Sequence, residues 1–204
     1  PGSMPPFSRD VAEEGVLFED FELVADGVLR EPQLRAALAA ARWPARNVAQ
    51  NVADLRAQLA ANARGAEELR RACAAWGVAT LRQAMQDVQA NAARSVESAI
   101  VALGARRGRC ELALDGGPRI VVAVELDPLA RRARIDFGGT SPAGGHNFNA
   151  PRAVVTAAVL YVFRTLVDHP IPLNEGCLAP LEVVVPAGSL LDPPRGSAVV
   201  AGNV

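Results

Sequence analysis

The chain has 204 residues, half of them apolar, and its 21 basic and 22 acidic residues leave a formal net charge of -1. A chain of this length can bury one sizeable core or two small ones, and its balanced charge predicts neither a nucleic acid nor an anionic membrane as partner. Every basic residue is an arginine, which excludes catalysis by a lysine amine and a P-loop lysine.

The cysteines and the apolar runs indicate a cytoplasmic protein without a membrane anchor. Cys73, Cys110 and Cys177 are widely spaced and form no CxxC pair, so neither a disulfide framework nor a zinc site is predicted. The most apolar stretch, residues 153–163, is much shorter than the roughly 20 residues of a membrane-spanning helix. Because the chain begins without methionine and stops directly after an apolar run, we expect an internal fragment of a longer protein.

Residues 1–48 are expected to form an irregular segment with short strands. Residues 15–18 and 21–24 alternate between apolar and polar positions around an acidic turn, which is typical of short strands.

Residues 49–105 are expected to form a helical arm. Apolar residues recur at three-four spacing from Val52 to Trp76 and again from Val78 to Leu103, which predicts two long helices. Gly77 supplies the left-handed residue that commonly ends a helix. So short a connection makes the helices either fold back antiparallel or bend into each other, and we expect an antiparallel hairpin.

Residues 106–204 are expected to form an α+β domain. The apolar period changes to two over residues 110–115, 120–126 and 133–137, and the intervening turn residues predict three sequential antiparallel strands. Pro151 can open a broadly apolar, buried helix, and two more strands are predicted at residues 181–185 and 198–201. The predicted fold class is therefore α+β, with a long antiparallel helical hairpin and a mostly antiparallel sheet packed on a buried helix.

Residues 138–150 form the most distinctive loop, with four glycines before a helix start. Free N–H groups at a helix start favour an anion, and glycines let a ligand approach the backbone. The loop lacks the spacing of a phosphate-binding motif, so a purely structural turn and a ligand-contacting loop both remain open.

Single residues carry weaker signals. His146 lies in this loop, but the one other histidine, His169, is not at metal-ligand spacing and is interpreted as a residue at a helix end. Cys177 is either a loop nucleophile or a buried structural residue, and its sequence neighbours favour burial. Two arginine clusters, at residues 106–109 and 131–134, are interpreted as solvated strand ends.

The order of local motifs is more informative than any single motif. These motifs are GSMPPFS (residues 2–8), NVADLRAQLAAN (51–62), QDVQAN (86–91), IDFGGTS (135–141), NFNAP (147–151), IPLNEGC (171–177), PAGSLL (186–191) and VVAGNV (199–204). Together they resemble the hydantoinase B/oxoprolinase family over essentially the whole chain. The glycine at 139 and the run Gly144-Gly145-His146 depart from the commoner family pattern, which leaves the choice of substrate open.

This resemblance implies a B-type part of an ATP-dependent enzyme, as in 5-oxoprolinase and N-methylhydantoinase. In such enzymes an A-type ATPase subunit or domain activates an amide or carbonyl oxygen by phosphorylation. The expected assembly is a cytoplasmic hetero-oligomer that opens a small cyclic amide, with ATP and Mg bound by the A-type partner. A divalent metal is implied for the full-length protein, in a segment preceding residue 2, whereas no cofactor is expected in this fragment, which is expected to be inactive alone.

The resemblance also selects candidate substrate-binding residues. Short polar groups in the glycine-bordered loop suit hydrogen bonding to a ring amide or an oxyanion. The candidates are Asp136, Thr140, Ser141, His146, Asn147 and Asn149, with Asn174, Cys177 and Asn203 as further candidates. No catalytic residue and no metal ligand is assigned. Two alternatives remain: a structural, subunit-interaction segment without substrate contact, and part of an acetone-carboxylase-like enzyme.

Overall fold

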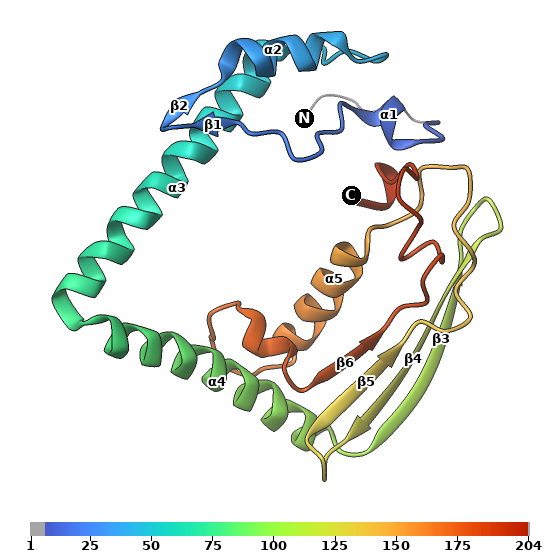
Figure 1. Cartoon of the computed structure of the whole chain (residues 1–204). Helices are drawn as coiled ribbons and strands as arrows, with labels where there is room; N and C mark the ends of the chain where they lie inside the picture. Colours follow the sequence, from blue (N-terminus) through green and yellow to red (C-terminus); the bar gives the residue numbers. More distant parts are fainter. Residues whose placement is uncertain (1–6, 204) are drawn as a thin grey trace.

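The structure is a computed structural model that describes residues 7–203. Most of the first motif, residues 2–6, and the last residue of the final motif, Val204, lie outside the described residues. In Figure 1 the chain passes from the N-terminal segment along two long helices and returns through a sheet to the end at which it started.

The N-terminal part contains more helix than the sequence pattern predicts. Its elements are α1 (Val11–Glu14), β1 (Val24–Ala25), β2 (Val28–Leu29) and α2 (Glu31–Ala40). The strand predicted at residues 15–18 is wrong, and the one at 21–24 is reduced to Val24. Asp26 and Gly27 both have positive φ, 50° and 79°, so a tight turn here pairs two very short strands.

Helix α2 was not predicted, and it forms a small core with the start of the next helix. Leu34 and Leu38 of α2 are buried together with Val52. A proline in the first turn fits the helix start, because that position needs no N–H donor.

Helices α3 (Val48–Trp76) and α4 (Val78–Leu103) confirm the two predicted helices, but the antiparallel hairpin is wrong. They meet at Gly77, whose φ is 82°, and diverge from there (Figure 1). Leu69 and Trp76, which an antiparallel hairpin would bury between its two helices, are 47% and 65% exposed. The reason is that α4 uses its apolar face elsewhere: Val96 and Ile100 are fully buried in the core beside the sheet.

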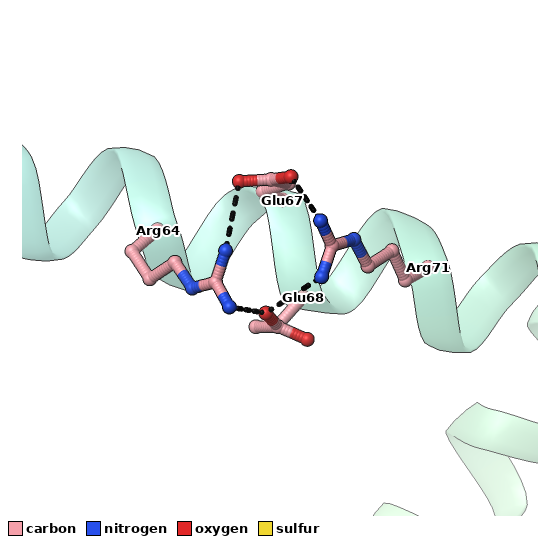
Figure 2. A network of polar contacts seen from close by, with 4 residues as sticks. All are labelled: Arg64, Glu67, Glu68 and Arg71. Carbon is pink, nitrogen blue, oxygen red and sulfur yellow. Dashed lines mark hydrogen bonds and ion pairs between the residues drawn. The ribbon is translucent and has the colours of Figure 1, made fainter.

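The middle of α3 is stabilised along its own surface. Figure 2 shows Arg64 and Arg71 flanking Glu67 and Glu68, with each arginine paired to both carboxylates at 2.6 to 3.3 Å. Residues three and four apart are neighbours on a helix, and each exposed pair of this kind contributes about 0.3–0.5 kcal/mol. This network stabilises a stretch of α3 whose apolar residues do not pack on α4.

The sheet contains four strands in the order β3-β4-β5-β6. Their bounds are β3 (Arg106–Ala113), β4 (Arg119–Asp127), β5 (Arg132–Asp136) and β6 (Leu181–Val184). The first three run antiparallel, joined by the predicted turns, and β6 pairs parallel to β5. The α+β class and the mostly antiparallel sheet are therefore confirmed.

Helix α5 (Arg152–Thr165) follows the glycine-rich loop, as predicted from Pro151. Val155, Val159 and Phe163 are buried, whereas Tyr161 on the other face is 70% exposed. The helix is thus buried on one face and not all round. The main core brings together residues of α4, α5 and one face of the sheet, including Ala92, Val96, Ile100, Leu126, Ile135, Val159 and Phe163.

The C-terminal part contains two short 3-10 helices, η1 (Glu175–Leu178) and η2 (Ala201–Asn203). The strand predicted at residues 198–201 is wrong. Its backbone groups bond to side chains and to the glycine-rich loop, so no neighbouring strand is needed. Between residues 7 and 203, no helix is long and apolar enough to cross a lipid bilayer.

Candidate functional site

The glycine-rich loop begins by extending the sheet with side chains. Gly139 has a φ of 91°, which only glycine adopts readily, and it turns the chain across β4. The Thr140 hydroxyl then accepts from Val121 N and donates to Val121 O, both at 3.1 Å. Ser141 bonds Arg119 N through its hydroxyl at 2.9 Å and Arg119 O through its amide at 2.9 Å. Both side chains therefore replace the backbone partners that β5 no longer supplies to β4.

Asn149 fastens the second half of the loop, and its side chain is fully buried. Its Oδ1 accepts from Gly144 N at 3.0 Å. Its Nδ2 donates to the carbonyl oxygens of Gly144, His146 and Ala198 at 2.7 to 3.0 Å. The amide is saturated by backbone partners, so it closes the loop and ties it to the C-terminal segment.

Asn147 is the second buried amide of the loop, 3% exposed. The backbone carbonyl oxygen of Asn147 accepts from the N–H groups of Ala201 and Gly202 at 2.9 and 3.0 Å. A Cβ at Gly202 would lie 2.3 Å from Asn149 O, which excludes any side chain there. The loop and η2 therefore touch backbone to backbone, and this places exposed Asn203 beside the loop.

Glu14 joins the N-terminal segment to the same place, and nothing in the sequence pattern singled it out. Its carboxylate accepts from Val199 N and Val200 N at 2.9 to 3.0 Å and from the Ser8 hydroxyl at 2.6 Å. Val11 N also donates to Gly196 O at 2.9 Å. Three of the motifs, ending at Ser8 and containing Asn149 and Val199, thus meet in one polar junction.

His146 and Phe148 are two side chains of the loop that remain accessible at this junction. Phe148 is 53% exposed and its ring centroid lies 5.8 Å from that of His146. His146 Nδ1 accepts from Phe148 N at 3.3 Å, which leaves the proton of the neutral ring on Nε2. The imidazole lies directly over Gly144, where a Cβ would come within 2.4 Å of Nε2. The imidazole is partly exposed, so a ligand can reach it.

Asp136 is separated from these groups, because it lies on the solvent face of the sheet. Its carboxylate accepts from Gly138 N at 2.7 Å and from Arg134 at 2.9 Å. The Gly138 amide, followed by the Arg134 guanidinium, lowers the pKa of Asp136 below its ordinary value. Asp136 and Arg134 line an open depression of about 480 Å³. The other charged residues that line it are Arg107, Arg109 and Glu125.

Asn174 and Cys177 lie at the other end of α5 from the loop, in the turn that packs on α4. Asn174 caps η1, accepting from Gly176 N at 2.9 Å, and Cys177 is fully buried in the main core. A Cβ at Gly176 would lie 2.0 Å from Gln89 O, so η1 approaches α4 more closely than any other residue would allow. These residues form a packing contact remote from the polar junction.

A hydroxyl, an imidazole and a carboxylate also meet at Ser95, His169 and Asp168. No pattern in the sequence predicted that these three residues lie together. Ser95 Oγ lies 3.3 Å from His169 Nε2, and His169 Nδ1 lies 2.7 Å from Asp168 Oδ1. His169 lowers the pKa of Asp168 through this hydrogen bond. Ser95 is nearly buried and donates to Asn91 O within α4 at 2.9 Å, so its proton is not directed to the imidazole. The group therefore joins the end of α5 to α4.

Metal ligands do not gather in the described chain. Among residues 7–203, no group of three or more His, Cys, Asp or Glu side chains could hold a metal ion. The three cysteines are all free thiols.

Comparison with known protein families assigns this fold, in which three motifs meet at one polar junction, to one family. The family model described as Hydantoinase B/oxoprolinase matches residues 1–204, so the chain belongs to that family. The recognition from the ordered motifs is thereby confirmed.

Named relatives agree with this assignment. 5-Oxoprolinase 1 of Arabidopsis thaliana is 38% identical over 229 residues, covering 100% of this chain and 18% of its own length. 5-Oxoprolinase of Saccharomyces cerevisiae is 36% identical, covering 100% of this chain and 17% of its own. The chain thus spans less than a fifth of these relatives.

A solved structure has the same fold. The ATP-dependent caprolactamase from Pseudomonas jessenii superimposes with a TM-score of 0.77 at 20% identity, over 96% of this chain and 34% of that one.

Proposed function

We propose that this chain is part of an ATP-dependent hydrolase of cyclic amides, of the 5-oxoprolinase or hydantoinase type. The observation that carries the proposal is the family match over all 204 residues, together with relatives named 5-oxoprolinase at 36% and 38% identity. The caprolactamase with the same fold supports a lactam as the substrate class. An A-type ATPase subunit or domain is the proposed partner, in a hetero-oligomer.

The chemistry explains why ATP is needed. A lactam nitrogen donates electron density into its carbonyl group, which makes the carbon a poor electrophile. Transfer of the terminal phosphoryl group of ATP to the carbonyl oxygen by the ATPase partner removes this protection and leaves ADP. Water then attacks the carbon, the ring C–N bond breaks so that the nitrogen leaves as the amine, and a second water releases phosphate from the resulting acyl phosphate. The nucleotide and its Mg are proposed to be bound by the partner, and a divalent metal by another part of the full-length protein.

Within this scheme we propose two roles for the loop candidates. Thr140, Ser141 and Asn149 hold the loop in place through the bonds to Val121, Arg119 and Gly144. His146, a partly exposed imidazole whose Nδ1 accepts from Phe148 N, is the proposed donor to the ring carbonyl or the oxygen derived from it. Asn203, exposed beside the loop, is the proposed second contact.

The experiment uses the full-length protein with its A-type partner. We expect phosphate release that depends on a cyclic amide, tested with 5-oxoproline, hydantoin and caprolactam, with one phosphate released for each ring opened. Ring opening without ATP, or ATP turnover unaffected by all three rings, contradicts the proposal. Product formation only with added bicarbonate would indicate a carboxylase instead.

A substitution separates substrate contact from assembly. His146→Ala is expected to lower kcat about 10-fold to 100-fold, as for loss of a hydrogen-bond donor to a developing charge, while the complex keeps its size. Phe148→Ala, which alters the neighbouring exposed ring, is the matched control. Unchanged turnover in His146→Ala would remove this residue from the site.

A structural role without substrate contact is the second candidate, and one observation favours it. The side chains of Asn149, Thr140 and Ser141 all have backbone partners within the chain. If His146→Ala and Asn203→Ala leave turnover intact while loop substitutions break the complex, this structural role is the correct one.

A further inference from the structure

We propose that strand β3 pairs antiparallel with β3 of a second copy of this chain, so that two sheets join into one across a two-fold axis. The proposal concerns an interaction surface and does not depend on which ring is the substrate.

The first observation is that, among residues 7–203, β3 is an uncovered edge of the sheet. It stands at one end of the strand order, and Figure 1 shows no element of the described chain beyond it. All eight residues of β3 are exposed, and Leu112 is 59% exposed. A long edge strand presents unpaired N–H and C=O groups to another strand, which proteins normally cover or block.

The second observation identifies the free backbone groups. Leu114 N donates to Pro118 O at 2.8 Å next to the β3–β4 turn. Bonding direction alternates along an antiparallel strand, so Leu112, Cys110 and Gly108 bond to β4. The N–H and C=O groups of Arg107, Arg109, Glu111 and Ala113 therefore point outward, where a second strand would sit.

The third observation is that the side chains select one pairing register. Since outward residues must face outward residues, a two-fold pairing that keeps at least five residues of β3 in the ladder is centred on Gly108, Arg109, Cys110 or Glu111. Centring on Cys110 puts Arg109 opposite Glu111 of the other copy, twice. Centring on Gly108 puts Arg107 opposite Arg109, and centring on Arg109 or on Glu111 puts each of these residues opposite itself, so like charges lie directly opposite, which is destabilising.

The same register matches shape as well as charge. Leu112 faces Gly108 of the other copy, so the bulky exposed side chain of one strand covers the bare backbone of the other. Arg109 reaches Glu111 Oε2 of its own strand only at 3.9 Å, which leaves its guanidinium available for a closer carboxylate across the axis. Glu111 accepts from Arg119 at 2.7 Å through Oε1, so Oε2 is the oxygen that would meet Arg109 of the other copy.

Cys110 provides a direct report of this register. It is the exposed one of the three free cysteines, with Cys177 buried and Cys73 partly so. On the axis it faces its own copy at a non-hydrogen-bonded position, where Cα atoms lie about 4.5 Å apart, within the disulfide range of about 4.4–6.8 Å.

The test uses the full-length protein and diamide, which takes up the two electrons and two protons released when two thiols form a disulfide. We expect a covalent dimer whose linking peptide is Cys110 to Cys110, and its loss in Cys110→Ser. Sedimentation of reduced protein should still show a dimer in Cys110→Ser. No Cys110 link, or a link from Cys110 to the A-type partner, overturns the proposal.

A charge exchange tests the register without any crosslink. Arg109→Glu and Glu111→Arg should each weaken dimer association about tenfold, because two attractive pairs become repulsive. The double variant Arg109→Glu/Glu111→Arg should regain association, and Arg131→Glu, at the far turn of the sheet, should match the wild type. Equal association in all variants, or no recovery in the double variant, overturns the proposal.

Discussion

Replacing Asn149 with alanine should release the glycine-rich loop from the C-terminal segment. The buried amide accepts from Gly144 N and donates to three carbonyl oxygens, of Gly144, His146 and Ala198. Each hydrogen bond contributes about 0.5–1.5 kcal/mol net, and an orphaned buried partner costs about 1–3 kcal/mol. Counting the acceptor bond and two full donor bonds gives a loss of about 3 kcal/mol, which is about a hundredfold change in the local opening equilibrium.

Hydrogen–deuterium exchange measures this change at the site itself. Amides at residues 143–150 and 198–203 should exchange about a hundredfold faster in Asn149→Ala, whereas those of β4 should be unchanged. Asn62→Ala, on the exposed surface of α3, is the matched control and should leave all of these rates as they are. Rates in the loop within about threefold of the wild type would refute the assignment of Asn149 as its fastening residue.

Two further predictions concern packing and pH. Gly176→Ala should lower the free energy of unfolding by about 1–3 kcal/mol and lower the thermal midpoint, because its Cβ would lie 2.0 Å from Gln89 O. Gly145→Ala is the control and should be neutral, because the space around its Cβ is open. Equal midpoints for the two variants would contradict this packing. Asp136 has a lowered pKa, chiefly through the Gly138 amide, so its contribution to stability is complete above its unfolded value of about 3.9 and is lost as the pH falls through the folded value. A carboxyl titration by NMR that placed the Asp136 midpoint at or above that unfolded value would oppose this reasoning.

Periodic segments were predictable from the sequence because their backbone hydrogen-bond partners lie nearby in the sequence. The three-four spacing gave both long helices, and alternation with turn residues gave the antiparallel strands, with ends shifted by a few residues. The relative direction of α3 and α4 was not predictable, since Val96 and Ile100 could pack either on α3 or on the sheet. Only the competing surface, distant in sequence, decides between these two arrangements.

The sequence predicts the glycine-rich loop as a candidate site, but it does not predict the structural role of each residue in that loop. Short amides and hydroxyls beside glycines suit a ligand and equally suit the chain itself, and for Asn149 and Thr140 the structure provides backbone partners. Glu14 carried no signal, because a carboxylate next to a short helix is common on any surface. Its partners, Val199 N and Val200 N, lie at the other end of the chain.

The contact between Glu14 and Val199 spans 185 positions, and this has a consequence for biosynthesis. A ribosome releases the acidic side chain early, but the amide groups that it holds emerge only after both helices and the whole sheet have been translated. Closing a contact of such long range costs loop entropy, and this cost is lower when the intervening chain is already ordered. The N-terminal segment therefore cannot dock until almost all of these residues have been translated. In a prematurely terminated chain, Glu14 lacks the amide groups that it binds.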